Sequence, residues 1–167
     1  KNFLFYVIEY FFNPEKELKQ ILDLLDKDGK IIIITPNYKD ILKDIWKNKS
    51  YLDFFYEKNA KNYFSIKSLK NLLKKIKVKN FKIHNKQGYS LLNSLNWLFN
   101  GLPTKSKFVG SDNMNQELKN KIDNFFFIEK NKINQVNFLI NKADRIYKNI
   151  CENNQLGNQI HLELKKN

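Results

Sequence analysis

Two apolar runs in the first 37 residues predict two buried strands. The first run covers residues 3–8, and the second covers residues 30–35. Both runs are continuously apolar rather than alternating. We therefore expect both faces of each strand to be buried, as in parallel sheets that are covered by helices on both sides. Pro36 cannot donate to a strand ladder and is expected to end the second strand.

The segment between these runs predicts a crossover helix. Asn13 is a favourable N-cap, and Pro14 suits the first helical position. Apolar residues recur at spacing i, i+3, i+4 and i+7 from Leu18 to Leu25, which predicts a helix from residue 14 to near residue 26 with one buried face. In a parallel strand–helix–strand unit, the chemistry gathers at the carboxyl ends of the strands.

The middle of the chain predicts a long connection and a second helix–strand unit. The connection, residues 38–64, contains a short helix capped by Asp40 and is rich in aromatic residues. These aromatic residues are expected to form a hydrophobic plug over the sheet, the wall of a substrate pocket, or both at once. Ser65 caps the next helix, residues 81–84 read as a strand, and Gly88 ends the unit.

The last third of the chain is expected to be mostly helical. Within residues 89–154 we expect an apolar helix that stops at Gly101, a loop over residues 104–113, and a helix capped by Asp112 that carries the apolar residues of positions 118–127. A further helix runs to about Ile150. Residues 158–165 alternate between polar and apolar side chains and predict a final strand.

The high positive charge of the chain is weak evidence for a nucleic-acid partner. The net charge is +13, which could indicate a polyanionic partner such as nucleic acid. Of the 30 basic residues, however, Arg145 is the only arginine, and arginine is the side chain that binds phosphate in a bidentate way. The lysines are spread along the whole chain, so biased composition is the favoured explanation and a nucleic-acid-binding module is a minor alternative.

Cysteine and histidine usage excludes two further classes of site. The single Cys151 leaves no intramolecular disulfide and fits a reducing, cytoplasmic location. His84 and His161 are distant in sequence and make no ligand cluster with it, so no metal site is expected. The apolar stretches fall short of the roughly 20 residues that span a bilayer.

The order of elements and the local motifs resemble the C-terminal half of a class I S-adenosylmethionine-dependent methyltransferase. The similarity is to the methyltransferase-domain group found among bacterial glycan and small-molecule enzymes. The motifs that carry it are Val7-Ile8-Glu9-Tyr10, Asn13-Pro14-Glu15, Asp28-Gly29-Lys30, Thr35-Pro36-Asn37, Tyr63-Phe64-Ser65 and Leu69 to Leu73.

This resemblance implies a fold and a domain organisation. The fold is α/β, a partial Rossmann-like sheet with strands equivalent to the fourth, fifth and sixth and an antiparallel seventh. Residues 1–88 and 155–167 would form the C-terminal part of the methyltransferase domain, and residues 89–154 would be a helical insertion acting as a substrate lid.

The resemblance also implies site residues. Glu9 and Tyr10 would be catalytic and would lie beside the methionine part of S-adenosylmethionine. The acceptor would contact Thr35 and Asn37 on the floor of the pocket. Aromatic residues would line its walls: Tyr51, Phe55, Tyr56 and Tyr63. Two simpler roles remain open, since Glu9 could cap the helix that starts at Asn13 and Asn37 could be a turn residue.

The chain departs from the family pattern in three places. It has no glycine-rich cofactor loop, because its five glycines are isolated. Tyr10 and Ala60 stand where the family usually has histidines, which removes two imidazoles from acid/base work. The chain also opens directly in a core strand, so we expect that the beginning of a domain is missing and that the chain is a fragment.

Three functions follow as hypotheses. The leading one is methyl transfer, with O-methylation of a saccharide hydroxyl as the expected reaction and a quinone or another small metabolite as alternative acceptors. The second is a non-catalytic remnant or one piece of a split methyltransferase, for which the expected partner is a second copy in a dimer or an N-terminal half supplied by another segment. The third is the nucleic-acid-binding module named above.

Overall fold

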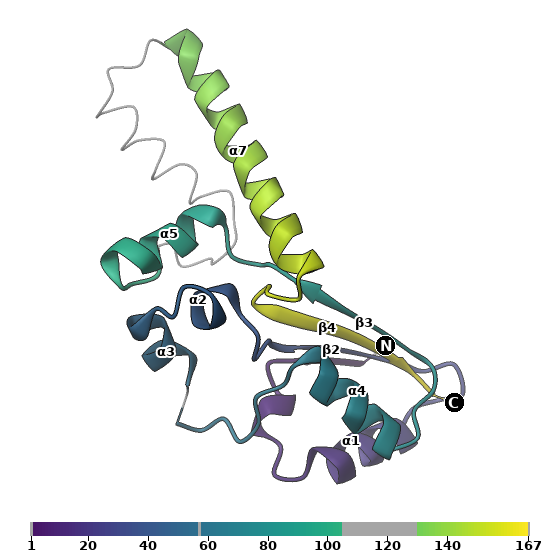
Figure 1. Ribbon diagram of the computed structural model, residues 1–167. Helices are drawn as coiled ribbons and strands as arrows, with labels where there is room; N and C mark the ends of the chain where they lie inside the picture. Colours follow the sequence, from purple (N-terminus) through teal and green to yellow (C-terminus); the bar gives the residue numbers. More distant parts are fainter. Residues whose placement is uncertain (1, 57, 105–129, 167) are drawn as a thin grey trace.

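The computed structural model describes residues 2–56, 58–104 and 130–166 (Figure 1). The helix predicted to start at Asp112 lies outside the described residues, as does most of the loop predicted at 104–113. Among the described helices, none is long and apolar enough to cross a membrane.

The described strands form one mixed sheet. They are β1 (Asn2–Phe5), β2 (Lys30–Pro36), β3 (Phe81–Lys86) and β4 (Gln159–Lys165), in the spatial order β1-β2-β4-β3. β1 pairs in parallel with β2, whereas β4 is antiparallel to both β2 and β3. The predicted α/β fold with an antiparallel last strand is therefore confirmed.

Two helices cover one face of this sheet (Figure 1). They are α1 (Pro14–Asp23) and α4 (Ile66–Lys75). The predicted caps are present, since the side chain of Asn13 accepts from the amide of Lys16 and that of Ser65 accepts from the amide of Ser68. The main core lies between these helices and the strands; its most buried members are Ile8, Leu18, Ile31, Ile33, Leu69, Leu73, Ile160, Leu162 and Leu164.

The prediction that both faces of the first two strands are buried was wrong. On β1, Phe3 is 54% exposed and Phe5 is 50% exposed. On β2, Ile31 and Ile33 are fully buried, whereas Ile32 and Ile34 are half-buried. Apolar residues occupy both faces, so the sequence shows no alternation even though the structure buries one face far more than the other.

The first strand is also shorter than predicted. It ends at Phe5 because Tyr6 adopts a left-handed backbone conformation, with φ at 54°. The Tyr6 amide still donates to the carbonyl of Ile34 at 2.8 Å, which ties the bend to β2. A 3-10 turn, η1 (Ile8–Tyr10), follows, so Glu9 and Tyr10 lie just beyond the strand rather than at its end.

A second group of helices stands beyond the carboxyl ends of the strands. It comprises α2 (Ile41–Asp44), α3 (Lys49–Phe55), α5 (Leu91–Asn100) and α7 (Lys130–Asn153). Asp40 caps α2 as predicted, and Gly101 ends α5 with φ at 65°. A small core of Leu42, Tyr51 and Trp97 joins α2, α3 and α5. α7 leads away from the sheet and packs near its end against α5 (Figure 1).

Candidate functional site

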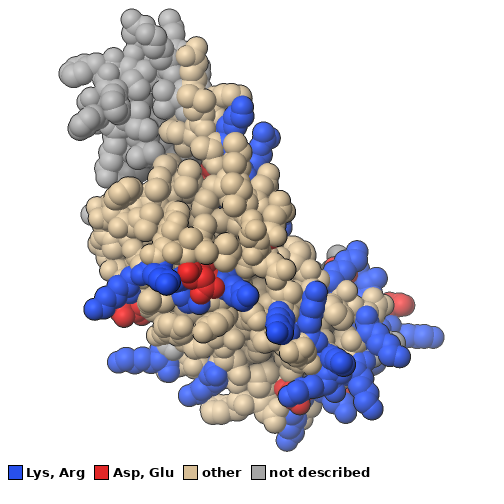
Figure 2. Space-filling view, viewed as in Figure 1, with Lys and Arg blue, Asp and Glu red and all other residues tan. Residues whose placement is uncertain are grey.

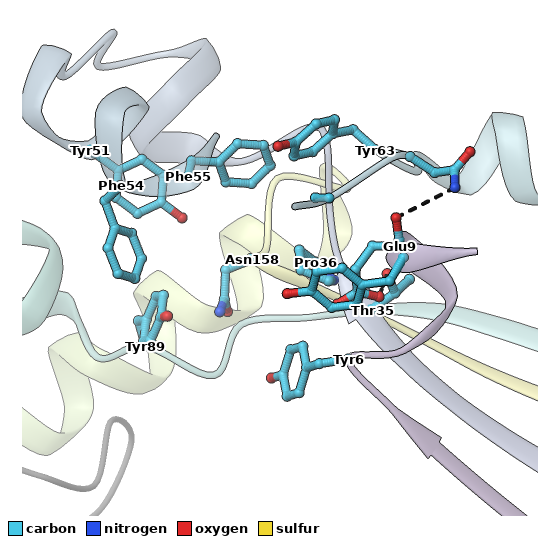
Figure 3. A pocket seen from close by; sticks show the side chains of 13 residues that line it. Tyr6, Glu9, Thr35, Pro36, Tyr51, Phe54, Phe55, Tyr63, Tyr89 and Asn158 are labelled. Carbon is cyan, nitrogen blue, oxygen red and sulfur yellow. Dashed lines mark hydrogen bonds between the residues drawn. The ribbon is translucent and has the colours of Figure 1, made fainter. Parts of the chain in front are cut away.

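A cavity of about 190 Å³ lies where the carboxyl ends of β1, β2 and β3 meet the start of β4. Its lining comes from segments far apart in sequence: the β1–η1 bend, the end of β2, helix α3, the loop before α4, and the residues that flank β3 and β4. Figure 3 shows the rings of Tyr51, Phe54 and Phe55 on one side of this space and those of Tyr6 and Tyr89 on the other. The carboxyl ends of parallel strands, here β1 and β2, are where ligand sites form in α/β sheets.

Glu9 is the charged residue of the lining. Only 5% of its surface is exposed, and its carboxylate accepts a hydrogen bond of 3.0 Å from the hydroxyl of Thr35. Its backbone carbonyl accepts from the amides of Lys61 and Asn62, which fixes η1 against the loop before α4. The carboxylate is thus held at the ends of two neighbouring parallel strands.

Glu9 does not cap the following helix. The first turn of α1 is capped by Asn13 itself, and the amide of Asn13 donates to Glu17 at 2.8 Å. The cap that the structure shows for α1 is thus Asn13 and not Glu9. A buried carboxylate costs free energy unless it is paired or hydrogen-bonded, and the hydroxyl of Thr35 supplies such a bond to Glu9.

The aromatic residues of the connection act as both plug and wall. The ring of Tyr51 packs edge-on against Trp97 at 5.2 Å, which seals α3 to α5. The rings of Phe55 and Tyr63 lie 5.6 Å apart and face the cavity. One cluster of aromatic residues therefore packs α3 against α5 and also lines the cavity, and its role as the wall of a substrate pocket remains a prediction.

A buried hydrogen bond supports this wall from behind. The hydroxyl of Tyr51 donates to the carboxylate of Asp40 at 3.1 Å, and the amide of Leu42 donates to the other oxygen at 2.7 Å. Burial raises the pKa of Asp40 to about 6 despite these bonds. Burial, together with the charge of Asp40, also raises the pKa of Tyr51, which keeps its hydroxyl as a donor.

Most of the predicted site residues meet at this cavity. The lining includes Glu9, Tyr10, Thr35, Tyr51, Phe55 and Tyr63, and it includes Ala60, which stands where the family usually has a histidine.

Two predicted residues do not line the cavity. Asn37 is buried, and its side-chain amide donates to the carbonyls of Gln155 and Gly157 at 3.0 and 2.7 Å, so it ties the end of β2 to the start of β4. Tyr56 stands beside the cavity and packs its ring against Tyr63 at 5.1 Å. The side chain of Asn37 therefore joins two strands in this structure, and its predicted contact with the acceptor remains untested.

The structure adds lining residues that the sequence did not single out. Tyr6 reaches the cavity because of its left-handed backbone, which no local pattern announces. Tyr89 follows the end of β3, and Asn158 directly precedes β4. The side-chain oxygen of Asn158 accepts from the amide of Gly88 at 2.7 Å. The remaining additions are Pro36, Phe54 and Asn62.

The lining differs in charge from the rest of the molecule. Lysine side chains gather over the region of α1 and α4 (Figure 2), where Lys16, Lys19, Lys75 and Lys77 border a shallow hollow. Among the described residues that line the cavity, by contrast, there is no lysine, arginine or histidine. Seven aromatic side chains and the Glu9 carboxylate dominate it: Tyr6, Tyr10, Tyr51, Phe54, Phe55, Tyr63 and Tyr89.

Comparison with known proteins gives a family match and a structural likeness. The family model described as "Methyltransferase domain" matches residues 3–82. A crystal structure of a SAM-dependent methyltransferase from Thermotoga maritima, described as a possible histamine N-methyltransferase, is 15% identical in sequence. It superposes with a TM-score of 0.51, over 99% of this chain and 54% of that one.

A second solved structure, a SAM-dependent methyltransferase from Archaeoglobus fulgidus, is 17% identical with a TM-score of 0.44, over 98% of this chain and 57% of that one. The chain therefore spans about half the length of each of these solved structures. No curated protein sequence gives a significant match.

Proposed function

Because residues 3–82 match the methyltransferase-domain family and the chain has a class I methyltransferase fold, we propose that it serves in methyl transfer from S-adenosylmethionine to a small-molecule acceptor. This match supports the methyltransferase domain that the sequence motifs predicted, whereas the identification of the chain as the C-terminal half of such a domain remains a prediction. The match also supports S-adenosylmethionine as the cofactor.

The observation that carries the proposal is the placement of Glu9. Its carboxylate is buried, bonded to Thr35 and next to the cavity at the carboxyl ends of two parallel strands. We assign Glu9 and Tyr10 to the methionine end of the cofactor, and Thr35 to the orientation of Glu9. The bound cofactor would supply an electrophilic methyl group, so the task of the protein is to hold the acceptor atom in line with it and to exclude water.

The size of the cavity indicates what it accommodates. About 190 Å³ is below the roughly 300–1,000 Å³ of pockets that enclose drug-sized ligands. It suits a group the size of one ring and not a cofactor and an acceptor together. We therefore assign the cavity to the acceptor, with Tyr51, Phe55 and Tyr63 as its walls; the lid role expected for residues 89–154 remains a prediction.

The nature of the acceptor is a separate question. The sequence-based expectation is a saccharide hydroxyl, and aromatic rings such as Phe55 and Tyr63 could stack on the apolar face of a sugar ring. This expectation remains a prediction, as does the cytoplasmic location. The charge of the lining is a second criterion for the acceptor, and it favours a different chemical class.

Methyl transfer is tested by incubating the protein with S-adenosylmethionine and a panel of ring-sized acceptors, and measuring the formation of S-adenosylhomocysteine. We expect formation that depends on the acceptor, with Glu9→Gln and Thr35→Val each lowering the rate at least tenfold. Phe12→Leu is a suitable control, because Phe12 is 88% exposed and lies outside the lining.

One observation favours the alternative of a non-catalytic piece. The 167 residues contain no Gly-x-Gly turn, the element that brings the backbone close to the cofactor in this family. If the alternative holds, calorimetry of this chain with S-adenosylmethionine detects no binding. Micromolar binding by these residues alone would exclude it.

A further inference from the structure

We propose that the cavity takes a positively charged amine, so that the methyl acceptor is an amine nitrogen rather than a saccharide hydroxyl. This inference rests on the proposed function and deepens it. It is drawn from the charge and the aromatic content of the lining, which are independent of the family match.

The first support is the distribution of charge. The chain carries 30 basic residues and a net charge of +13, yet none of these side chains lies among the described residues of the lining. The charged group that does line the cavity is the carboxylate of Glu9, which is 5% exposed. An anionic ligand would lose its hydration and meet a negative charge, whereas a cation would balance that charge.

The second support is the arrangement of rings. Tyr6 and Tyr89 approach the cavity from one side and Phe54 and Phe55 from the other, as Figure 3 shows. The faces of aromatic rings attract ammonium groups, and this attraction strengthens as water is excluded. A cage of rings closed by one carboxylate is a binding site for a protonated amine.

The third support is the backbone of Tyr6. Left-handed conformations are strained for non-glycine residues. Among the described residues Tyr6 shares this conformation with Lys47, Lys77 and Gln155, and of these four Tyr6 alone lines the cavity. Tyr6 has φ at 54°, and its hydroxyl accepts a hydrogen bond of 2.6 Å from Gln159. The strained backbone brings this ring to the cavity beside Glu9. Burial, together with the charge of Glu9, raises the pKa of the Tyr6 hydroxyl.

The chemistry of the step balances with these residues. A primary ammonium acceptor gives one proton to the carboxylate of Glu9 and becomes a neutral amine. The nitrogen lone pair then forms a bond with the methyl carbon, while the carbon–sulfur bond breaks and its electron pair stays on sulfur. The products are an N-methylammonium and a neutral thioether, and Glu9 releases its proton to water.

Three ring compounds of one shape test the proposal without any cofactor. Benzylamine is a cation at neutral pH, benzyl alcohol is neutral, and benzoate is an anion. The protein is titrated with each compound in a calorimeter. Benzylamine is expected to bind about ten- to thirty-fold more tightly than benzyl alcohol. Benzoate and methyl glucoside are expected to bind more weakly than benzyl alcohol.

Variants locate this preference at the cavity. Glu9→Gln is expected to remove most of the advantage of benzylamine over benzyl alcohol. Tyr6→Leu is expected to weaken the binding of benzylamine several-fold. Phe12→Leu, which removes an exposed ring outside the lining, is expected to leave that binding unchanged. Circular dichroism verifies folding, and if Glu9→Gln does not fold, the ligand series on the unmodified protein and Tyr6→Leu still decide.

Two results would overturn the inference. One is benzyl alcohol or methyl glucoside binding as tightly as benzylamine. The other is a protein that binds S-adenosylmethionine more tightly than S-adenosylhomocysteine while showing no preference for benzylamine, because the carboxylate then serves the sulfonium of the cofactor and the proposed function stands. Benzylamine binding with no binding of either cofactor form supports the cationic site and counts against the proposed function instead.

Discussion

Two carboxylates buried near the cavity are held in different ways. Glu9 accepts from a side-chain hydroxyl on the neighbouring strand, whereas Asp40 caps α2 and accepts from Tyr51. For Asp40 the cost of burial exceeds the gain from its hydrogen bonds, and its pKa rises to about 6. The folded protein therefore holds a proton on Asp40 at a pH at which the unfolded chain has lost it.

The difference between the pKa of Asp40 in the folded protein and in the unfolded chain predicts a pH-dependent stability. Because the folded pKa is raised, the contribution is fully present below about pH 4 and is lost as the pH rises through about 6. The free energy of unfolding of the protein relative to Asp40→Asn is expected to fall by roughly 2–3 kcal/mol over this range. Urea unfolding of both proteins across it measures the effect, and a constant difference would contradict the prediction.

A second prediction concerns Gly157, where the chain enters β4. Its amide donates to the side-chain oxygen of Asn85 at 2.6 Å, and a Cβ here would lie 2.6 Å from the backbone oxygen of Lys86. Gly157→Ala is expected to destabilise the protein by about 1–3 kcal/mol, because backbone must move to admit the methyl group.

Gly88→Ala is the matched control for this substitution. There the new Cβ would lie 3.0 Å from the end of the flexible Gln159 side chain, which can move aside. The midpoint of thermal unfolding is expected to be clearly lower for Gly157→Ala than for Gly88→Ala. Equal midpoints would show that the close approach at Gly157 is relieved without cost.

Helix α4 illustrates how local signals set an element. Ser65 and Ser68 form a reciprocal pair, in which the hydroxyl of Ser65 accepts from the amide of Ser68 at 3.1 Å and that of Ser68 accepts from the amide of Ser65 at 2.8 Å. Leu69 and Leu73 are fully buried on the inner face. The cap fixes where α4 begins, and the stripe of leucines fixes which side packs on the sheet.

The cap can be tested with two substitutions at one position. Ser65→Ala is expected to lower the free energy of unfolding by about 1 kcal/mol, because an amide of the first turn loses its acceptor. Ser65→Asp keeps an acceptor at the helix start and is expected to lose less than half of that. Urea unfolding compares the two, and equal losses would mean that the hydrogen bond is not what stabilises the helix start.

At the scale of the whole molecule, the sheet has one covered and one open face. In the described residues β1 pairs with β2 alone, and Phe3 and Phe5 are half-exposed on it. Unpaired strand edges with apolar side chains are templates for association. The dimer that the sequence led us to expect remains a prediction, and this edge is where we expect it to form.

This expectation can be tested with charge. Light scattering is expected to show self-association of the protein as its concentration rises, and the double variant Phe3→Lys, Phe5→Lys is expected to stay monomeric. Phe12→Lys places the same charge at a highly exposed ring that lies off the strand and should not change the association. A protein that is monomeric at every concentration would contradict the idea.

The sequence alone determined the order of the elements and the residues that begin them. Asn13, Asp40 and Ser65 cap the helices predicted for them, and the alternation of residues 158–165 gave the last strand, because caps and periodicity depend on residues close together in the chain. The same local patterns placed Thr35 at the end of its strand and Glu9 after the first strand, and both residues line the cavity, although Glu9 lies in the turn η1 rather than at the strand end itself.

The tertiary structure alone decided what surrounds those two residues. Tyr6, Tyr89 and Asn158 reach the cavity through a left-handed bend and through pairing between β3 and β4, and Asn37 is turned away from it by bonds to the chain more than one hundred residues later. These contacts join distant segments, so no local pattern encodes them. The charge of the lining, which points to an amine, is likewise a property of the folded chain and not of any one stretch of sequence.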